Sequence, residues 1–178
     1  MKILVVSGSP RSESNTELMA EAFAEGARSA GHDVDIIRLS EHRVLPCLAC
    51  DYCFTHDGAC VQRDDMDAFV EDLCAADALV FASPIYWFGF SGQLKCFVDR
   101  LYAFTRRSLN VGACALLLNS QDEDVFESCE YELARTCAYL GWENRGALKA
   151  PGMKGRAYIE QTDYLDKARE FGRTFARS

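Results

Sequence analysis

The sequence predicts an α/β fold in which helices cover both faces of one parallel β-sheet, giving three layers. Short apolar runs rich in β-branched residues, such as Ile3 to Val6, alternate along the chain with longer segments of helical periodicity. This alternation favours right-handed crossovers between parallel strands. The length of 178 residues fits one domain spanning 1–178.

Five strands and five helices are expected. The strands are expected at about 2–7, 34–39, 78–82, 111–118 and 142–148. The helices are expected at about 15–30, 64–74, 91–102, 125–140 and 164–175. Ser14 followed by Glu17 fits a capping box at the first helix, while Gly31 and Gly141 fit left-handed caps at the ends of the first and fourth.

The connection at about 40–63 is a cysteine-rich insertion. Connections this long inside a compact domain are uncommon and usually functional. The insertion holds four of the nine cysteines: Cys47, Cys50, Cys53 and Cys60. The other five lie in predicted helices or strands, where we expect them to act as small buried hydrophobic residues: Cys74, Cys96, Cys114, Cys129 and Cys137.

The composition is that of a globular protein, with 49% hydrophobic and 26% charged residues. No apolar run approaches the roughly 20 residues that a membrane span needs. No signal peptide is expected, because a strand begins almost at the first residue. The net charge of −8 argues against a nucleic-acid partner. We therefore expect a cytoplasmic protein that binds neither membrane nor nucleic acid.

The polar loop after the first strand is a predicted anion site. The first N–H groups of a helix lack intrahelical partners and carry partial positive charge. The loop has one arginine and lacks both the P-loop and the G-x-G-x-x-G pattern, so a monophosphate fits better than a triphosphate. The expected phosphate-binding residues are Ser9, Arg11, Ser14, Asn15 and Thr16. An ordinary serine-rich turn is the alternative interpretation.

The loop after the third strand is a second candidate site. Aromatic side chains at the end of a strand are well placed to contact a flat ring ligand, and backbone amides near Gly89 would bind its polar edge. The expected ring-binding residues are Pro84, Ile85, Tyr86, Trp87, Phe88 and Gly89. Alternatively, these aromatic residues fill the core or form an oligomer interface.

In combination, these motifs resemble the NAD(P)H-dependent FMN reductases of the flavodoxin-like superfamily. Residues 7–11 (Ser-Gly-Ser-Pro-Arg) and 14–16 (Ser-Asn-Thr) resemble the phosphate loop of that family. Residues 83–88, 91–95 and 99–100 resemble the family's second flavin loop and the helix behind it. Residues 46–53, 60 and 64–66 resemble the compact cysteine motif of the iron–sulfur flavoprotein branch. The similarity spans residues 1 to about 148.

The resemblance implies a flavodoxin-like sheet of strand order 2-1-3-4-5 and non-covalently bound FMN. It implies an enzyme that takes electrons from NAD(P)H or reduced ferredoxin and passes them to a small-molecule acceptor. It also implies a homodimer or homotetramer. Hydride transfer to a flavin needs no dedicated acid or base, so no catalytic side chain is expected. The alternatives are an electron carrier without substrate turnover and a zinc-stabilised binding module.

The four clustered cysteines are separated by two, two and six residues. The first two gaps match ferredoxin-like runs, and the resemblance implies a four-iron, four-sulfur cluster held by Cys47, Cys50, Cys53 and Cys60. Structural zinc, a disulfide and empty thiols are the alternatives.

The loop 119–124 departs from the family pattern. Its three acidic residues do not suit a site beside a flavin phosphate or a pyridine nucleotide phosphate.

Overall fold

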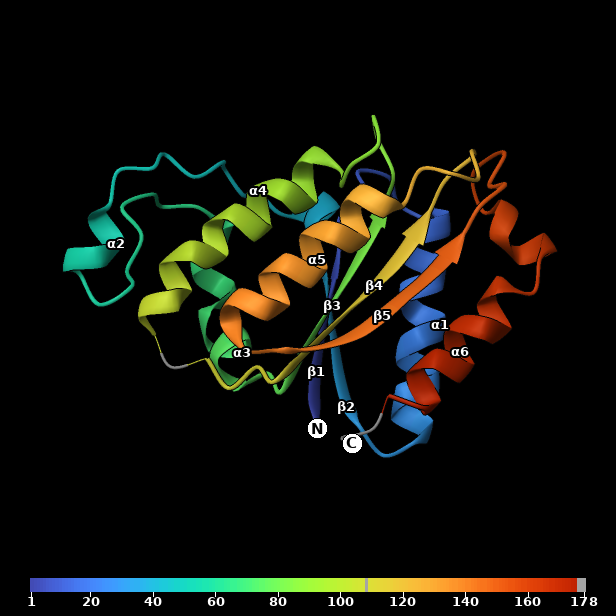
Figure 1. Cartoon of the computed structure of the whole chain (residues 1–178), viewed down its shortest axis with the longest axis horizontal. Helices are drawn as coiled ribbons and strands as arrows, with labels where there is room; N and C mark the ends of the chain where they lie inside the picture. The colour runs from blue at the N-terminus through green and yellow to red at the C-terminus, as the bar shows by residue number, and fades with distance from the viewer. Residues whose placement is uncertain (108, 176–178) are drawn as a thin grey trace.

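The computed structural model describes residues 1–107 and 109–175 and has the expected three layers (Figure 1). Its five strands form one sheet in which every neighbouring pair is parallel, in the order β2-β1-β3-β4-β5. The strands are β1 (Lys2–Ser7), β2 (Asp33–Arg38), β3 (Ala78–Pro84), β4 (Ala113–Asn119) and β5 (Glu143–Ala150). The predicted fold class and strand order are both confirmed.

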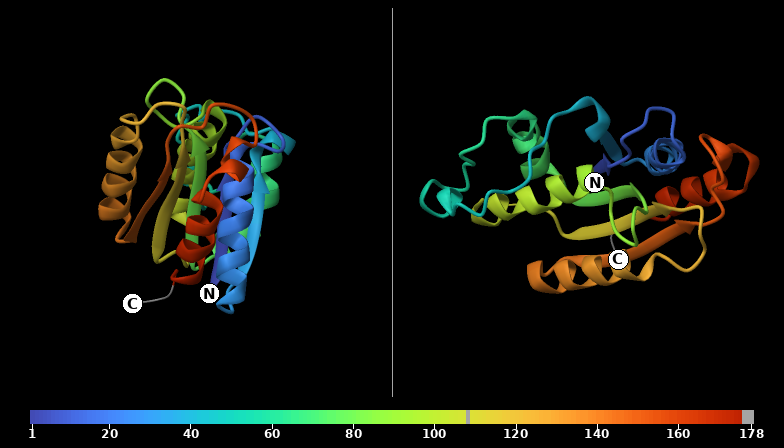
Figure 2. Two further views of the ribbon diagram at one scale, coloured as in Figure 1. Left: turned by 90° about the vertical axis from the view of Figure 1, so that its right-hand side faces the viewer. Right: turned by 90° about the horizontal axis from the view of Figure 1, so that it is seen from above.

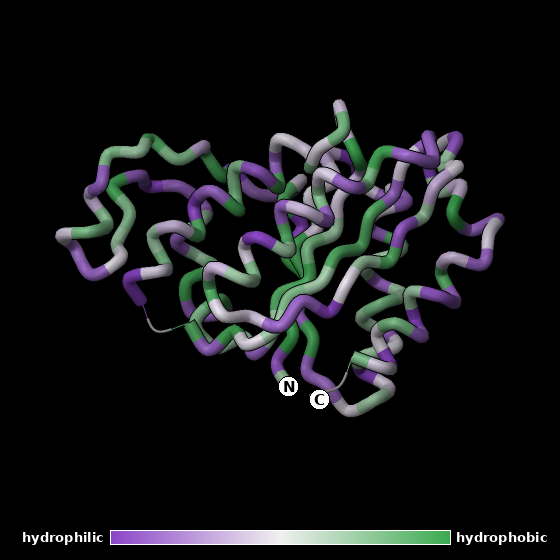
Figure 3. The backbone as a smooth tube through the Cα atoms, viewed as in Figure 1, coloured by the Kyte–Doolittle hydropathy of each residue, from purple (hydrophilic) through white to green (hydrophobic). Residues whose placement is uncertain are grey.

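Helices cover the two faces of the sheet (Figure 2). One face carries α1 (Asn15–Ser29) and α6 (Tyr164–Arg173), and the other carries α3 (Val70–Ala75), α4 (Gly92–Arg100) and α5 (Glu127–Leu140). Successive residues of a strand point to opposite faces, so Ile3 and Val5 pack under α1 while Leu4 and Val6 join the core on the other side. The most apolar backbone segments are accordingly the central strands (Figure 3).

Short helices complete the structure: η1 (Leu39–Glu41), α2 (Tyr52–Thr55), η2 (Asp65–Phe69), η3 (Leu101–Arg106) and η4 (Tyr158–Gln161). Two expected helices are each divided into an α-helical and a 3-10 part, η2–α3 and α4–η3. The third strand is longer than expected and ends at Pro84. A proline is tolerated there because its missing N–H falls at the last residue of the strand.

The local signals for the helix ends are confirmed. The Ser14 hydroxyl accepts a hydrogen bond from the Glu17 amide (3.2 Å), and α1 begins at the next residue. Gly31 and Gly141 both have left-handed φ angles, 86° and 72°. None of the helices in the described chain has the length and apolar character needed to cross a bilayer.

The arrangement of loops follows from the parallel sheet. All five strands end at one edge, so the loops after β1, β3, β4 and β5 meet there (Figure 1). The cysteine-rich insertion lies elsewhere, beyond α4 and η3, at the far end of the molecule.

Candidate functional site

A polar cleft of about 330 Å³ lies at the carboxyl ends of β1, β3 and β4. Its volume is in the range of small-molecule sites. The loops after β1, β3 and β4 meet at this cleft, and the loop after β5 joins them. The lining residues are Ser9, Arg11, Ser14, Asn15, Thr16, Pro84, Ile85, Tyr86, Asn119, Ser120, Gln121, Asp122, Met153, Lys154, Gly155 and Arg156.

The structure brings all five predicted phosphate-binding residues into this cleft. The Thr16 hydroxyl accepts a 2.7 Å hydrogen bond from Nδ2 of Asn119, which leaves its own proton available to a ligand. The Ser14 hydroxyl likewise only accepts, from the Glu17 amide. Both side chains stand at the first turn of α1, where free backbone N–H groups favour an anion.

Asn15 has a different role from the one expected. Its Nδ2 donates to the carbonyl of Gly155 (2.8 Å), and its Oδ1 accepts from the amide of Ile159 (3.0 Å). These two bonds tie the start of α1 to the loop after β5. Asn15 therefore positions the wall of the cleft, and only the second hydrogen of its Nδ2 is left for a phosphate.

Six polar residues of the cleft were not named as site residues from the sequence: Asn119, Ser120, Gln121, Asp122, Lys154 and Arg156. Asn119, at the end of β4, is buried and orients Thr16. Lys154 and Arg156 come from the loop after β5 and add two positive charges to that of Arg11. The rule that ligands bind at the carboxyl ends of parallel strands applies to β5 as well as to its neighbours, so it could have identified this basic pair.

The aromatic loop is only partly in the cleft. Pro84, Ile85 and Tyr86 line it, whereas Trp87, Phe88 and Gly89 do not. Tyr86 and Gly89 exchange two backbone hydrogen bonds, which closes a two-residue turn with Trp87 and Phe88 at its tip. Trp87 is 95% exposed and Phe88 61% exposed.

The turn holds both aromatic residues at left-handed φ angles, 52° and 63°. This conformation normally selects asparagine or glycine. The two rings are thus presented to solvent at a cost in backbone strain.

The acidic loop intrudes less than its sequence suggests. Of its three acidic residues, only Asp122 lines the cleft, where Lys154 and Arg156 also lie. The positive charges of Arg11, Lys154 and Arg156 outnumber this single carboxylate, so the cleft suits a phosphate despite the acidic loop.

Cys47, Cys50, Cys53 and Cys60 all line a second cavity, of about 290 Å³, beside α4 and η3. All four thiols are free. Burial raises the pKa of the Cys53 thiol, and the three neighbouring cysteines raise it further. A zinc ion would need its sulfur ligands about 3.8 Å apart, given a Zn–S bond of about 2.3 Å. Within 1–107 and 109–175, no three His, Cys, Asp or Glu side chains form such a group.

Arg100 forms part of the wall of the cysteine cavity and joins the two ends of the insertion. Its Nη1 donates to the Leu45 carbonyl (3.1 Å) and to Oδ2 of Asp64 (2.7 Å), and its Nη2 donates to Oδ1 of Asp64 (3.1 Å). Its Nε is buried and has no hydrogen-bond partner among the described residues. Asp64 neutralises the Arg100 guanidinium, so Arg100 contributes to this wall one N–H without a partner and no net positive charge.

The cysteines outside the insertion behave largely as predicted. Cys114, Cys129 and Cys137 are buried, whereas Cys74 and Cys96 are only partly so. Burial raises the pKa of the Cys129 thiol to about 11, so this thiol stays protonated at neutral pH. Such thiols are inert packing groups.

Fold and cleft together define a class: a flavodoxin-like α/β protein with a polar cleft at the carboxyl edge of its sheet. The sequence model of the NADPH-dependent FMN reductase family matches residues 1–141. The chain belongs to this family.

Several curated relatives are iron–sulfur flavoproteins. The one from Methanosarcina thermophila is 39% identical over 108 residues, which cover 61% of this chain and 56% of the relative. One from Archaeoglobus fulgidus is 34% identical over 107 residues, covering 60% of this chain and 48% of the relative. The matched segment thus spans about half the length of these relatives.

Solved structures share the fold. The NAD(P)H:quinone oxidoreductase from Methanothermobacter marburgensis superposes with a TM-score of 0.76 at 20% identity, covering 100% of this chain and 98% of that one. RosB with a bound flavin phosphate intermediate also gives 0.76, at 18% identity, covering 97% of this chain and 76% of that one. At these identities the similarity is one of fold.

Proposed function

We propose that this protein is an FMN-dependent oxidoreductase that takes electrons from NAD(P)H, or from reduced ferredoxin, and passes them to a small acceptor. The observation that carries the proposal is the cleft. It combines hydroxyl donors at the start of α1 and three basic side chains with an apolar wall formed by Pro84, Ile85 and Tyr86. Family membership supports the same cofactor.

Different residues would bind the two ends of FMN. Ser14 and Thr16 would bind the phosphate through their hydroxyls, with Arg11 nearby. Ser9 would bind it through its backbone amide, because the Ser9 hydroxyl donates to the Arg11 carbonyl (3.1 Å). Pro84 to Tyr86 would support the ring. Bound FMN supplies the redox chemistry, since it can accept a hydride and pass on one or two electrons. The protein contributes binding, orientation and electrostatics.

An absorbance spectrum of anaerobically purified protein tests the proposal. We expect flavin bands that NADPH or NADH bleaches. Bleaching by dithionite alone would instead favour a flavodoxin-like carrier or a ferredoxin-fed enzyme. A colourless protein that FMN cannot reconstitute would refute flavin binding.

A charge reversal tests the assignment of the phosphate end. Arg11→Glu places a carboxylate at the cleft and should weaken FMN retention by at least about tenfold, equivalent to roughly 1.4 kcal/mol. Arg135→Glu, on the exposed surface of α5, is the matched control and should bind FMN normally. Equal affinities in the two variants would place the phosphate elsewhere.

We also propose a four-iron, four-sulfur cluster at Cys47, Cys50, Cys53 and Cys60. The support is the cavity that all four cysteines share, and the buried Nε–H of Arg100 in its wall, which has no partner among the described residues. Anaerobic protein should contain about four iron and four sulfide per chain, and Cys60→Ser should lower both. Stoichiometric zinc in place of iron would contradict this proposal.

A homodimer or homotetramer is the proposed assembly, supported by the exposed tip at Trp87 and Phe88. Replacing the tip by Asn-Gly suits the backbone of the turn and removes both rings. Light scattering should then show smaller particles of folded protein. An unchanged mass would exclude the tip from the interface.

A further inference from the structure

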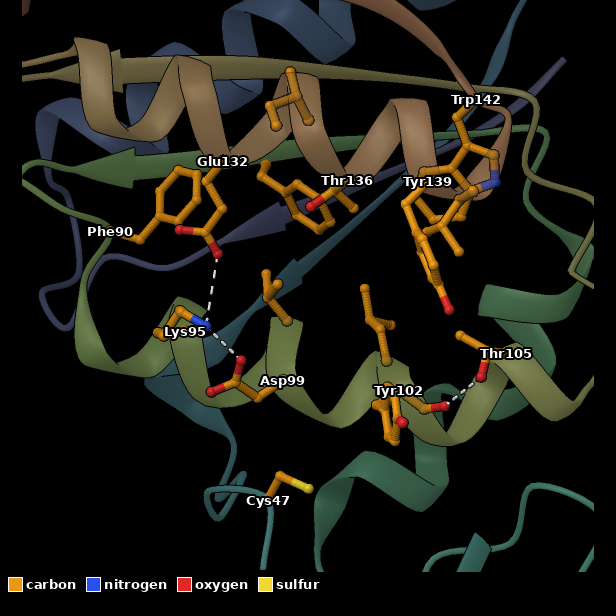
Figure 4. Close-up of a pocket in the computed structure, with 15 residues that line it drawn as sticks. Cys47, Phe90, Lys95, Asp99, Tyr102, Thr105, Glu132, Thr136, Tyr139 and Trp142 are labelled. Carbon is orange, nitrogen blue, oxygen red and sulfur yellow. Dashed lines mark hydrogen bonds and ion pairs between the residues drawn. The ribbon is translucent and has the colours of Figure 1, made fainter. Parts of the chain in front are cut away.

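A third cavity, of about 390 Å³, lies between α4–η3 and α5, on the face of the sheet opposite α1 (Figure 4). Its floor includes Phe81 of β3, which is 4% exposed, so the cavity reaches down to the sheet. Among the described residues it shares no lining residue with the polar cleft. Cys47 lies at its edge.

The walls are aromatic and aliphatic. Phe90 lies at one end and Trp142 at the other, with Tyr139 on the α5 side and Tyr102 on the α4–η3 side (Figure 4). Phe90, Val98, Leu101 and Trp142 are only partly buried although they pack against the main core. Tyr102 is 50% exposed and Tyr139 82% exposed, so the cavity is open to solvent between these two side chains. A cavity of this size therefore leaves apolar surface that a ligand could cover.

Charge at the cavity selects against anions. Lys95 contacts the carboxylates of Asp99 and Glu132, the latter at 3.6 Å (Figure 4). Lys95 is the one cation among the described lining residues, and two carboxylates neutralise it. A phosphate or carboxylate ligand would find no free positive charge here, whereas an uncharged ring would lose little on leaving water.

Thr136 supplies a polar contact. It stands on α5 and projects toward the space between the helices (Figure 4). Unlike Thr105, whose hydroxyl donates to the Tyr102 carbonyl (2.8 Å), Thr136 has no hydrogen-bond partner for its hydroxyl in the described chain. Its proton is available to a carbonyl oxygen of a ligand.

We propose that this cavity binds a planar, uncharged aromatic molecule of two or three fused rings that carries a carbonyl oxygen. The rings lie against Phe81, Tyr139 and Trp142, and the carbonyl accepts from Thr136. The volume is near the lower end of small-molecule sites, which sets the size of the ligand. This site is separate from the flavin cleft, and its ligand binds whether or not FMN is reduced.

The probe for the test is 2,3-dimethyl-1,4-naphthoquinone. It is neutral, has two fused rings, and its two methyl groups prevent addition of the Cys47 thiol. The chain has two tryptophans, so Trp87→Phe leaves Trp142, in the wall of the cavity, as the single reporter. Titration of the FMN-loaded protein should give saturable quenching of Trp142 fluorescence.

Three variants in this background decide the result. Thr136→Phe fills the cavity and should weaken binding by at least about tenfold. Ala134→Phe, an exposed site on the same helix, should leave binding unchanged. Thr136→Val keeps the side-chain volume but removes the hydroxyl donor. It should weaken binding about fivefold, the equivalent of about 1 kcal/mol. If Thr136→Phe fails to fold, Thr136→Val alone tests the proposal.

Absence of saturable quenching would overturn the proposal, and so would equal affinity in the Thr136 and Ala134 variants. The proposal would also be overturned if a second copy of the chain covered the cavity. In that case the probe should not bind, and Thr136→Phe should change the particle mass. A flavin that neither NAD(P)H nor reduced ferredoxin can reduce would refute the proposed function and leave this result standing.

Discussion

Arg100 and Asp64 form a bidentate ion pair whose side chains are only 2% and 1% exposed. The same carboxylate accepts hydrogen bonds from the amides of Leu45 (2.8 Å) and Met66 (3.2 Å). Leu45 lies near the start of the cysteine-rich insertion and Asp64 directly after it. The pair thus closes the insertion at its base and anchors it to α4.

Removing one partner of this pair should be strongly destabilising. Arg100→Met leaves the Asp64 carboxylate buried without its counter-ion, and we expect a loss of about 3 kcal/mol in the free energy of unfolding. The double variant Asp64→Asn/Arg100→Met removes both charges and should recover part of the loss. Urea denaturation of both variants measures this. A single variant within about 1 kcal/mol of the parent would show that water enters the site and solvates the carboxylate.

The pair should also give the protein an acid-sensitive component. Burial alone would raise the pKa of Asp64, but the hydrogen bonds from Arg100 and the Leu45 amide outweigh it and hold this pKa below its ordinary value. The unfolded chain therefore binds the proton first. The stabilisation is complete above about pH 4, the ordinary Asp value, and is lost as pH falls through the folded-state pKa.

Comparing the parent with the Asp64→Asn/Arg100→Met variant isolates this effect. Below about pH 4 the parent should lose unfolding free energy more steeply with falling pH. Parallel curves for the two proteins would mean that Asp64 has the same pKa in the folded and unfolded chain.

Local signals in the sequence were sufficient to predict the three layers of the fold. The cap at Ser14 and the left-handed turn at Gly141 depend on neighbouring residues, and both were predicted from the sequence. Side-chain partners distant in sequence were not predicted. Asn15 bonds residues 140 and 144 positions away, and a serine-rich loop gives no sign that its amide side chain will also hold another loop.

The division of the aromatic turn between cleft and solvent was not predicted, for a related reason. Tyr86 and Trp87 are adjacent, and sequence alone cannot distinguish a side chain on the wall of the cleft from one on the tip of a turn. The direction of each ring depends on the backbone bonds between Tyr86 and Gly89. Neighbouring residues of a turn can therefore have different surroundings. Here Tyr86 lines the cleft and Trp87 faces solvent.

Two glycines allow α1 and α6 to pack with their backbones in contact. A Cβ on Gly26 would lie 1.9 Å from the Arg169 carbonyl oxygen, and one on Gly172 would lie 2.0 Å from the Phe23 carbonyl oxygen. Since the obstacles are backbone atoms, Gly26→Ala should force the helices apart and lower the unfolding free energy by on the order of 3 kcal/mol.

Gly92→Ala is the control for this prediction. Gly92 is the first residue of α4, and its Cβ would meet no atom within 4 Å. Alanine there should be neutral or slightly stabilising, by up to about 1 kcal/mol. Thermal denaturation of the two variants should separate them clearly. If both melt like the parent, then α1 and α6 do not make this close contact in solution.

The basic pair after β5 should strengthen phosphate binding. Lys154→Ala and Arg156→Ala each remove a positive charge from the cleft. Because both side chains are exposed, we expect each to weaken FMN binding only about fivefold, near 1 kcal/mol, with a smaller difference at high salt. Fluorescence titration measures this, and riboflavin, which lacks the phosphate, is the control ligand. Equal weakening of both ligands would assign the pair to the ring or ribityl end.

Gly8 links the phosphate loop to the helix beneath it, and its replacement should affect both stability and cofactor binding. The Ser91 hydroxyl donates to the Gly8 carbonyl (2.6 Å), and a Cβ on Gly8 would lie 2.5 Å from the Cβ of Leu94. Leu94 is fully buried at the start of α4, so it cannot move aside easily. Gly8→Ala should cost about 2 kcal/mol in unfolding free energy and displace the adjacent Ser9.

FMN titration at low temperature, where the variant remains folded, should show weakened binding as a separate effect. Ser12→Ala, in the exposed part of the same loop, should match the parent in both measurements. A Gly8→Ala protein that is destabilised but binds FMN normally would show that Ser9 does not hold the phosphate. The phosphate would then depend on the first turn of α1 and the basic side chains around it.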